Sequence, residues 1–265
     1  MKQFVLPTGY KGTPSYTLRG EHYHYIVNVL RARVGTTFAG LDSEGTPVTI
    51  ELRSVGNDSC EIDVRPAVAE GELSVSARRG SVAPSITLFQ CIPKGKKMDL
   101  IVRQATETGV SAIVPVLSRH TVPRFDDRDW RNKKERWTRV MREAVQQSGR
   151  GTLPTLEDPI SLAEIANFWS ERGPGLFCHE RPLAHESLHG YLVGDTQRVA
   201  LVIGPEGGLA PAESKQLMDA GFGAVYLGEN VLRVETATLF AIAAVRIVLL
   251  ERDRWILHDK LNESG

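Results

Sequence analysis

The sequence has few cysteines and no long hydrophobic run. Its three cysteines, Cys60, Cys91 and Cys178, are an odd number without CxxC spacing, which indicates neither a disulfide framework nor a structural zinc site. The longest apolar stretch, Ala237 to Leu250, is interrupted by Arg246 and is too short to span a bilayer. The first residues also lack the apolar core of a signal peptide. We therefore expect a cytoplasmic protein without a membrane partner.

Common ligand-binding motifs are absent as well. The chain has neither the GxGxxG fingerprint of dinucleotide-binding folds nor a GxxxxGK[ST] phosphate loop. His179, His185 and His189 match no zinc-binding spacing, so we expect no metal site. Ser148 and Ser161 lack the surroundings of a nucleophile elbow, which leaves little support for a hydrolase.

The net charge is zero, but the charges are unevenly distributed. Residues 81–154 hold 14 Lys and Arg against 7 Asp and Glu, whereas residues 155–265 hold 9 against 16. A basic middle segment can bind phosphate groups locally even when the whole protein is neutral. The alternative interpretation of this segment is an ordinary solvated face.

The first part of the chain has the pattern of a small β domain. Between residues 4 and 66, short alternating apolar runs are separated by glycines about ten residues apart, which predicts an antiparallel barrel. The runs at residues 36–41 and 48–52 are the clearest strands of this kind. Helical spacing at Glu21 to Arg31 predicts a short helix within it.

The second part has a different pattern. Residues 73–83 contain small and turn-forming residues without a period, and they predict a linker between a domain of residues 1–72 and one of residues 84–265. After the linker, continuous apolar strands alternate with helices, which predicts an α/β domain with a mostly parallel sheet. The predicted strands are 86–92, 112–117, 199–203 and 224–227, and the predicted helices are 97–108, an amphipathic 130–147, one with Pro211 in its first turn, and 236–256.

Two of these strands run into loops with unusual composition. Residues 199–203 lead into GPEGG at 204–208, and residues 224–227 lead into a loop that ends at Ala237. Because the carboxyl ends of parallel strands open onto one crevice, the two loops predict a ligand site. The alternatives are a tight turn without a ligand for the first loop, and for the second an ion pair of Arg233 with Glu235, or capping of the last helix by Glu235 or Thr236.

Five stretches together resemble one enzyme family. They are IGPEGG at 203–208, LGENVLRVETA at 227–237, EAVQQSGR at 143–150, KGKKMDLIVRQATETGV at 94–110 and VLR at 29–31. Taken together and in their order along the chain, they resemble the bacterial 16S ribosomal RNA methyltransferases that modify N3 of a uridine, which belong to the SPOUT superfamily. The chain departs from the family pattern at Val234, where threonine is usual, at Glu229 and Asn230, where basic residues are common, and at Thr108.

The resemblance implies a fold, a cofactor and partners. It implies a PUA-like barrel at the N-terminus, a trefoil-knotted SPOUT domain at the C-terminus, S-adenosylmethionine as methyl donor and a homodimer. The implied RNA partner is the small-subunit ribosomal RNA in an assembled particle. The implied donor-binding residues lie in three loops, the first of them at 177–180: Cys178, Ile203, Gly204, Gly208, Leu227, Gly228, Leu232, Thr236 and Ala237.

Methylation at N3 of uridine makes two chemical demands on the site. N3 carries a proton, so the site needs a proton acceptor and a group that stabilises negative charge on the neighbouring carbonyl oxygens. Arg233 is predicted for the second role, because its guanidinium offers a planar fork of donors and does not deprotonate. Glu206 and Glu235 are the candidates for the base.

Basic residues supply the predicted RNA contacts, mainly to phosphates. They are Arg31, Arg119, Arg131, Lys134, Arg139 and Arg150. We interpret Trp130 and Trp137 as core residues rather than as platforms for base stacking. The alternatives for the function are a SPOUT methyltransferase acting on a ribose 2′-hydroxyl or on transfer RNA, and a noncatalytic RNA-binding assembly factor.

Overall fold

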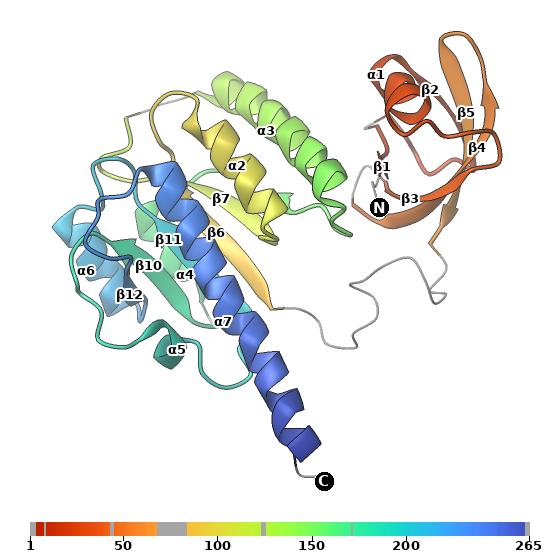
Figure 1. The fold of residues 1–265 in the computed structure, drawn as a ribbon. Coiled ribbons are helices and arrows are strands. Elements are labelled where there is room, and N and C mark those ends of the chain that lie inside the picture. The colour runs from red at the N-terminus through yellow and green to blue at the C-terminus, as the bar shows by residue number, and fades with distance from the viewer. Residues whose placement is uncertain are drawn as a thin grey trace. The chain divides into compact units, whose positions relative to one another are not determined.

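The chain folds into two compact units (Figure 1). The computed structural model describes residues 4–7, 9–42, 45–67, 84–122, 126–170 and 172–262, with side chains as far as residue 251. The first unit takes in Met1–Gly80 together with Met141–Leu153, and the second takes in Ser81–Val140 and Pro154–Gly265. The predicted linker at 73–83 lies outside the described residues. The segment Met141–Leu153 groups with the first unit, whereas the sequence-based division places it in the second domain.

The first unit contains a five-stranded sheet. In spatial order its strands are β1 (Phe4–Val5), β3 (Thr37–Leu41), β4 (Pro47–Val55), β5 (Ser59–Pro66) and β2 (Ser15–Arg19). All pairings are antiparallel except β1 with β3. The strands predicted at 36–41 and 48–52 are thus confirmed as β3 and β4. Alternate side chains of β4 and β5 are buried, which gives this unit its core.

The predicted helix of the first unit is confirmed, but it consists of an α-helical part followed by a π-helical part. Gly20–His24 forms α1, and Tyr25–Val29 continues it as a π-helical turn. Ile26 is fully buried in the core of the sheet. A second, smaller apolar cluster joins Val5 and Leu41 to Val145 and Leu153 of the segment Met141–Leu153, and this cluster explains why that segment belongs to the first unit.

The second unit contains a parallel seven-stranded sheet. In spatial order its strands are β12 (Gly223–Tyr226), β10 (Gly175–His179), β11 (Arg198–Ile203), β6 (Ser85–Cys91), β7 (Ala112–Leu117) and β8 (Thr155–Leu156), and β9 (Ile160–Ser161) also pairs with β7. Every pairing is parallel. The predicted parallel sheet is therefore confirmed. Three strands were not predicted: the two-residue strands β8 and β9, and β10, whose residues 177–179 the resemblance assigned to a loop.

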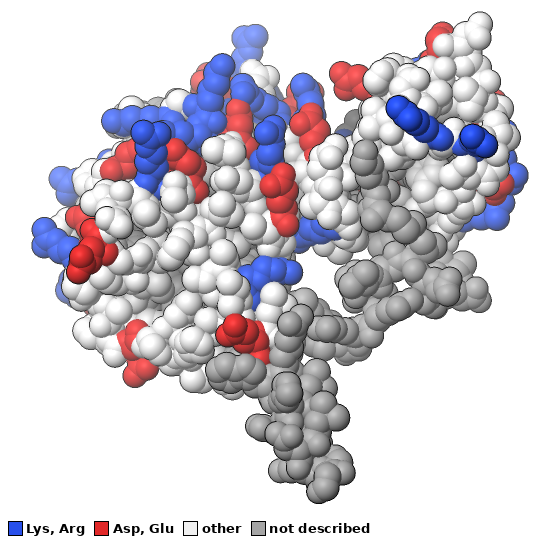
Figure 2. All heavy atoms as spheres, in the orientation of Figure 1, with Lys and Arg blue, Asp and Glu red and all other residues white. Residues whose placement is uncertain are grey.

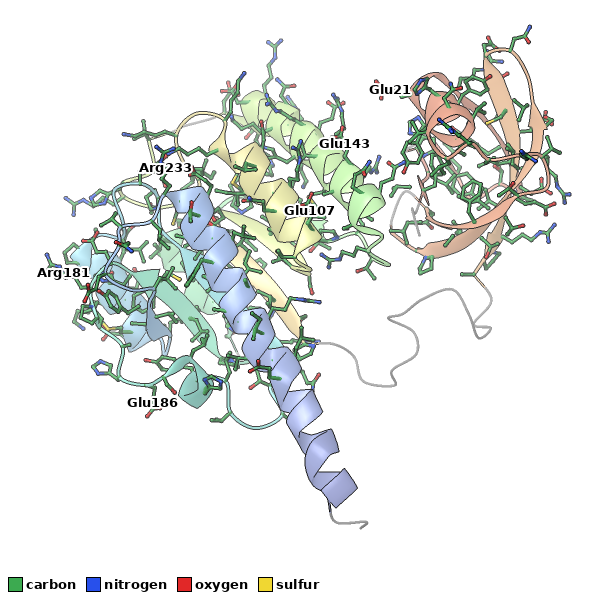
Figure 3. All side chains as sticks on the ribbon, in the orientation of Figure 1. Glu21, Glu107, Glu143, Arg181, Glu186 and Arg233 are labelled. Atoms are coloured by element: carbon green, nitrogen blue, oxygen red, sulfur yellow. The ribbon has the colours of Figure 1, made fainter. Side chains whose placement is uncertain are left out.

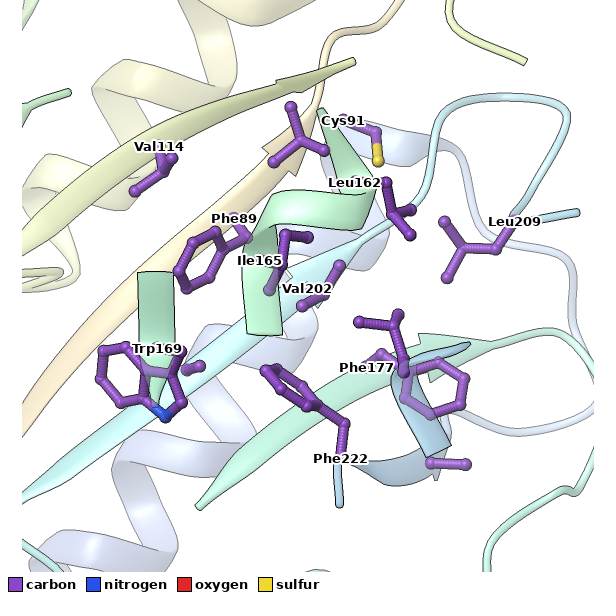
Figure 4. Close-up of a cluster of buried hydrophobic side chains, with 14 residues drawn as sticks. Phe89, Cys91, Val114, Leu162, Ile165, Trp169, Phe177, Val202, Leu209 and Phe222 are labelled. Carbon is purple, nitrogen blue, oxygen red and sulfur yellow. The ribbon is translucent and has the colours of Figure 1, made fainter. Parts of the chain in front are cut away.

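Helices cover both faces of this sheet. They are α2 (Lys97–Glu107), α3 (Asp127–Ser148), the short 3₁₀ turn η2 (Leu162–Glu164), α4 (Ile165–Trp169), α5 (Leu188–Tyr191), α6 (Pro211–Asp219) and α7 (Val234–Asn262). Helices α2 and α7 pack side by side on one face (Figure 1). On the other face, side chains of η2, α4 and α6 join alternate residues of the strands in one apolar cluster (Figure 4). Because both faces are covered, the central strands β6 and β11 are buried along almost their whole length. Among the described residues, no helix is both long enough and apolar enough to cross a membrane.

Candidate active site

Three loops meet at one edge of the parallel sheet. Strand β10 lies between β11 and β12, and all three run in the same direction, so the loops that follow them leave from the same edge. These loops are residues 180–187, 204–210 and 227–233. The two loops that the sequence singled out are therefore brought together, with the third between them.

Two glycines in these loops have backbone conformations that other residues rarely adopt. Gly208 has φ +66° and Gly228 has φ +109°. A Cβ at Gly208 would meet nothing nearer than Oε2 of Glu180, at 3.9 Å, and a Cβ at Gly228 would meet nothing within 4 Å. Conformation, rather than lack of space, therefore requires glycine at both positions. The open space at Gly228 leaves its backbone accessible to a ligand.

Glu206 ties the Gly204–Gly208 loop to the neighbouring β6–α2 loop. Its two carboxylate oxygens accept from the backbone N–H of Lys94 at 3.1 and 3.2 Å, and one of them accepts from Nζ of Lys97 at 2.8 Å. Burial raises the pKa of Glu206, but the hydrogen bonds from Lys97 and from backbone N–H groups outweigh it and leave the pKa lower than usual. An engaged carboxylate with a lowered pKa is a weak proton acceptor.

His120, in the β7–α3 loop, holds the same glycine loop from another side. Its Nδ1 lies 3.1 Å from the carbonyl oxygens of both Gly207 and Gly208. Carbonyl oxygens only accept hydrogen bonds, so we assign the proton of His120 to Nδ1. Glu213, in the first turn of α6, adds a third link, because it accepts from the backbone N–H of Arg119 at 2.7 Å. The glycine loop is thus fixed by residues outside it.

Arg233 occupies the N-cap position of α7. Its carbonyl oxygen accepts the first helical hydrogen bond, from the N–H of Ala237 at 2.8 Å. Its side chain is exposed at the end of the loop (Figure 3) and makes no ion pair or hydrogen bond with the residues that the structure describes. The alternative of an ion pair between Arg233 and Glu235 is therefore wrong. Capping by Glu235 or Thr236 is wrong too, because both residues lie inside the first turn.

Glu235 differs from Glu206 in its surroundings. Its Oε2 is buried, and no group in the described parts of the chain donates a hydrogen bond to it. A carboxylate in the first turn of a helix is stabilised by the positive end of the helix dipole. Glu235 therefore has an oxygen without a partner, whereas both oxygens of Glu206 are engaged.

A buried polar pair fixes the first turn of α7 to the sheet. Gln90, fully buried near the end of β6, accepts from the hydroxyl of Thr238 at 2.8 Å and donates from its Nε2 to the carbonyl of Cys91 at 2.9 Å. Sequence reasoning missed this pair. The available signal was a polar residue within the apolar run of residues 86–92 and another within the apolar last helix.

The residues predicted to bind the donor form a partly apolar surface around these loops. Ile203 is buried, Thr236 is exposed, and the remaining side chains are half-buried: Cys178, Leu227, Leu232 and Ala237. Burial raises the pKa of the Cys178 thiol to about 12. The thiol therefore stays neutral at physiological pH and does not offer a thiolate nucleophile at this edge. No three His, Cys, Asp or Glu side chains within the described ranges are grouped closely enough to hold a metal ion.

The predicted RNA contacts differ in how free their side chains are. In the second unit, Arg119, Arg131 and Arg139 are exposed, whereas Nζ of Lys134 lies 2.6 Å from Oδ1 of Asp158. In the first unit, Arg31 is exposed and Nε of Arg150 donates to Oγ1 of Thr152 at 3.3 Å. Figure 2 shows that Lys and Arg side chains gather over α2 and α3, with acidic side chains among them.

The two tryptophans of α3 pack against each other, with ring centroids 5.8 Å apart. Trp137 is only 3% exposed, which confirms it as a core residue. Trp130 is half-buried, and its Nε1 donates to Oδ1 of Asp158 at 3.0 Å. Neither ring is therefore fully free to stack on a base.

Comparisons with known proteins agree with this arrangement. A family model described as RNA methyltransferase domain matches residues 81–246. The chain is 29% identical over 238 residues to "Ribosomal RNA small subunit methyltransferase E" of Bacillus subtilis (strain 168), covering 88% of this chain and 90% of that protein. It is 33% identical over 178 residues to the protein of the same name from Mycobacterium bovis, covering 66% of each. A crystal structure of a Ribosomal RNA small subunit methyltransferase E from Neisseria gonorrhoeae bound to S-adenosyl methionine is similar with a TM-score of 0.74 and 28% identity, covering 94% of this chain and 98% of that one.

Proposed function

We propose, since the chain belongs to the RNA methyltransferase domain family, that this enzyme transfers a methyl group from S-adenosylmethionine to N3 of a uridine in 16S ribosomal RNA. Relatives over most of its length are ribosomal RNA small subunit methyltransferases, and one similar structure binds S-adenosyl methionine. The observation that carries the proposal is the meeting of three loops at one sheet edge, with the exposed guanidinium of Arg233 beside them.

The residues at this edge fit the proposed donor. S-adenosylmethionine has an apolar adenine face, polar edges and a sulfonium whose methyl group is the one transferred. Half-buried apolar side chains such as Leu227 and Leu232 suit the adenine face, and the accessible backbone around Gly208 and Gly228 suits its polar edges. The loop contacts made by Glu206 and His120 hold this surface in shape before a ligand binds, which reduces the entropy lost on binding.

The mechanism follows from the chemistry of N3. As the N3 proton leaves, negative charge spreads to the two neighbouring carbonyl oxygens of the base. Arg233 is exposed and unengaged among the described residues, so its guanidinium is available to donate to one of these oxygens. For the base we prefer Glu235 to Glu206, because one oxygen of Glu235 has no hydrogen-bond partner in the described part of the chain, while Glu206 is already paired with Lys97. Positioning of N3 in line with the methyl group contributes the remainder of the rate enhancement.

The finer features of the family are also part of the proposal. They are the trefoil knot around the three loops, a PUA-like first unit, a homodimer, a cytoplasmic location and a substrate within an assembled small-subunit particle. One feature of α7 supports the homodimer: Phe240, Ile247 and Leu250 are 53, 54 and 42% exposed. Their helical spacing places them on one stripe, which a second copy of the chain would cover.

One experiment separates the proposed activity from its alternatives. Small ribosomal subunits from cells lacking this protein are incubated with the purified enzyme and S-adenosylmethionine, and the digested RNA is analysed by nucleoside mass spectrometry. We expect N3-methyluridine to appear. A 2′-O-methylated nucleoside, or a product only in transfer RNA, would support the other SPOUT activities. RNA binding without donor binding would support the noncatalytic assembly factor.

A further inference from the structure

The loop between β6 and α2 carries an unexplained concentration of positive charge. Lys94 and Lys96 are exposed, and no residue described by the structure forms an ion pair with their ammonium groups. The third lysine, Lys97, is paired with Glu206. The sequence motif that starts at residue 94 supports the family resemblance, but neither the donor site nor the proposed mechanism uses its first residues.

This loop lies directly against the donor loops. Strand β6 pairs with β11 in parallel, with Gln90 opposite Ile203, so residues 92–96 and 204–210 leave the sheet side by side. The carboxylate of Glu206 then joins them through the Lys94 N–H and the Lys97 ammonium. Two exposed lysines are therefore held next to the loop in which we place the methyl donor.

The charges along this edge of the sheet are polarised. The loop after β10 contains Glu180, Arg181 and Glu186, and the loop after β12 contains Glu229 and Arg233, so each mixes both signs. The loop after β6, by contrast, contains two lysines and no acidic residue. The positive end of the α2 dipole, whose N-cap has no side-chain hydrogen bond, adds to the same side.

A polyanion that approaches this edge is therefore attracted to one side of it. A uridine whose base reaches the methyl donor brings its flanking phosphates to the rim of the same site. Two basic residues of α3 serve less well for these phosphates, since Lys134 is paired with Asp158 and Arg136 with Asp99.

We propose that Lys94 and Lys96 bind the phosphodiesters that flank the target nucleotide, and that Glu206 holds this lysine loop against the donor loop. The inference rests on the proposed function, because it takes RNA as the substrate. It adds a substrate-binding site that the sequence did not predict, and it makes Glu206 a positioning residue through Lys97. The ligand is the RNA backbone, so the site binds charge without reading sequence.

The test compares two double variants that remove the same charge. Lys94→Gln/Lys96→Gln alters the proposed site, and Arg172→Gln/Arg198→Gln is the matched control at the opposite edge of the sheet, near the starts of β10 and β11. The probe is the small ribosomal subunit from cells lacking the enzyme. Binding is measured by filter retention over a series of salt concentrations, methylation by single turnover at varied subunit concentration, and donor affinity by calorimetry.

We expect the lysine variant to bind the subunit about tenfold or more weakly. The slope of its plot of log affinity against log salt should be smaller in magnitude by about one to two units, since each phosphate contact to a single strand contributes about 0.7 to that slope. The methylation rate at saturating subunit and the donor affinity are expected to stay within about twofold of wild type, because neither lysine contacts the reacting atoms. The control is expected to behave as wild type.

Three outcomes decide the matter. Unchanged affinity and salt slope in the lysine variant would overturn the inference, and so would an equal loss in the arginine control, which would indicate a general charge effect. A wild-type enzyme that makes no N3-methyluridine would refute the proposed function instead, and that result is read from nucleoside mass spectrometry independently of the binding curves.

Discussion

The buried pair of Gln90 and Thr238 allows a quantitative prediction. Thr238→Val keeps the side-chain volume but removes the hydroxyl, which lies 2.8 Å from both Oε1 of Gln90 and the carbonyl of Val234. Gln90 is fully buried, so its Oε1 would lose its donor where water cannot replace it. Leaving a buried acceptor unsatisfied costs about 1–3 kcal/mol, and we expect Thr238→Val to lower the free energy of unfolding by about that amount.

The double variant provides the sharper test. Gln90→Leu/Thr238→Val replaces both partners with apolar groups, so we expect its loss of stability to be smaller than the sum of the two single losses by about 1 kcal/mol or more. Urea unfolding followed by tryptophan fluorescence measures this in the second unit, because Trp130, Trp137, Trp169 and Trp255 all belong to it. Losses that add within about 0.5 kcal/mol would refute the argument, since the two side chains would then act independently.

Three further predictions concern the site itself. Arg233→Ala is expected to slow single-turnover methylation by about 100-fold or more with donor affinity nearly intact, and Arg233→Lys is expected to restore only part of the rate. Near-native turnover of Arg233→Ala would assign the charge-stabilising role to another cation. Loss of both donor binding and stability would show that Arg233 has a structural role. Because the folded-state pKa of Glu206 is lowered, its stabilisation is present above the ordinary glutamate pKa and is lost as the pH falls through the folded value. Urea unfolding should therefore separate Glu206→Gln from wild type at about pH 7 and much less at about pH 3, well below the ordinary glutamate pKa. An equal gap at both pH values would contradict the assigned ion pair. Donor binding measured by calorimetry is expected to be the same with and without a chelator, and a loss of affinity in chelator would reveal a metal requirement.

The sequence predicted most of the longer elements of the second unit, because their pattern is decided locally. Strands buried on both faces need continuous apolar residues, and the runs at 112–117 and 199–203 meet that condition. Strand β10 was harder to recognise, since it spans only Gly175–His179 and ends in a polar residue, His179. The grouping of Met141–Leu153 with the first unit depends on contacts between residues far apart in sequence, such as Leu41 with Val145, and no local pattern reveals these.

The candidate site, like the fold, was only partly predictable from the sequence. Glycine loops at the ends of parallel strands predicted where a ligand binds, because chain direction alone brings strand ends together. The partners of individual side chains were not predictable. Glu206 was a candidate base until the structure paired it with Lys97, and His120 had no motif that linked it to Gly207 and Gly208. These contacts join residues on different loops, so they depend on the final geometry.

A neutral protein that binds RNA must rely on the local arrangement of its charges. With zero net charge, long-range attraction to a polyanion is weak, and salt screens it beyond about 10 Å. Attraction then operates mainly where exposed cations have no ion-pair partner among the residues that the structure describes, as at Lys94 and Lys96, and it is opposed where acids are exposed, as at Glu180 and Glu229. Mixed signs along one edge limit nonspecific binding while favouring one side for the RNA backbone. On this view, the ion pair of Lys97 with Glu206 removes one cation from RNA binding and uses it to place the other two.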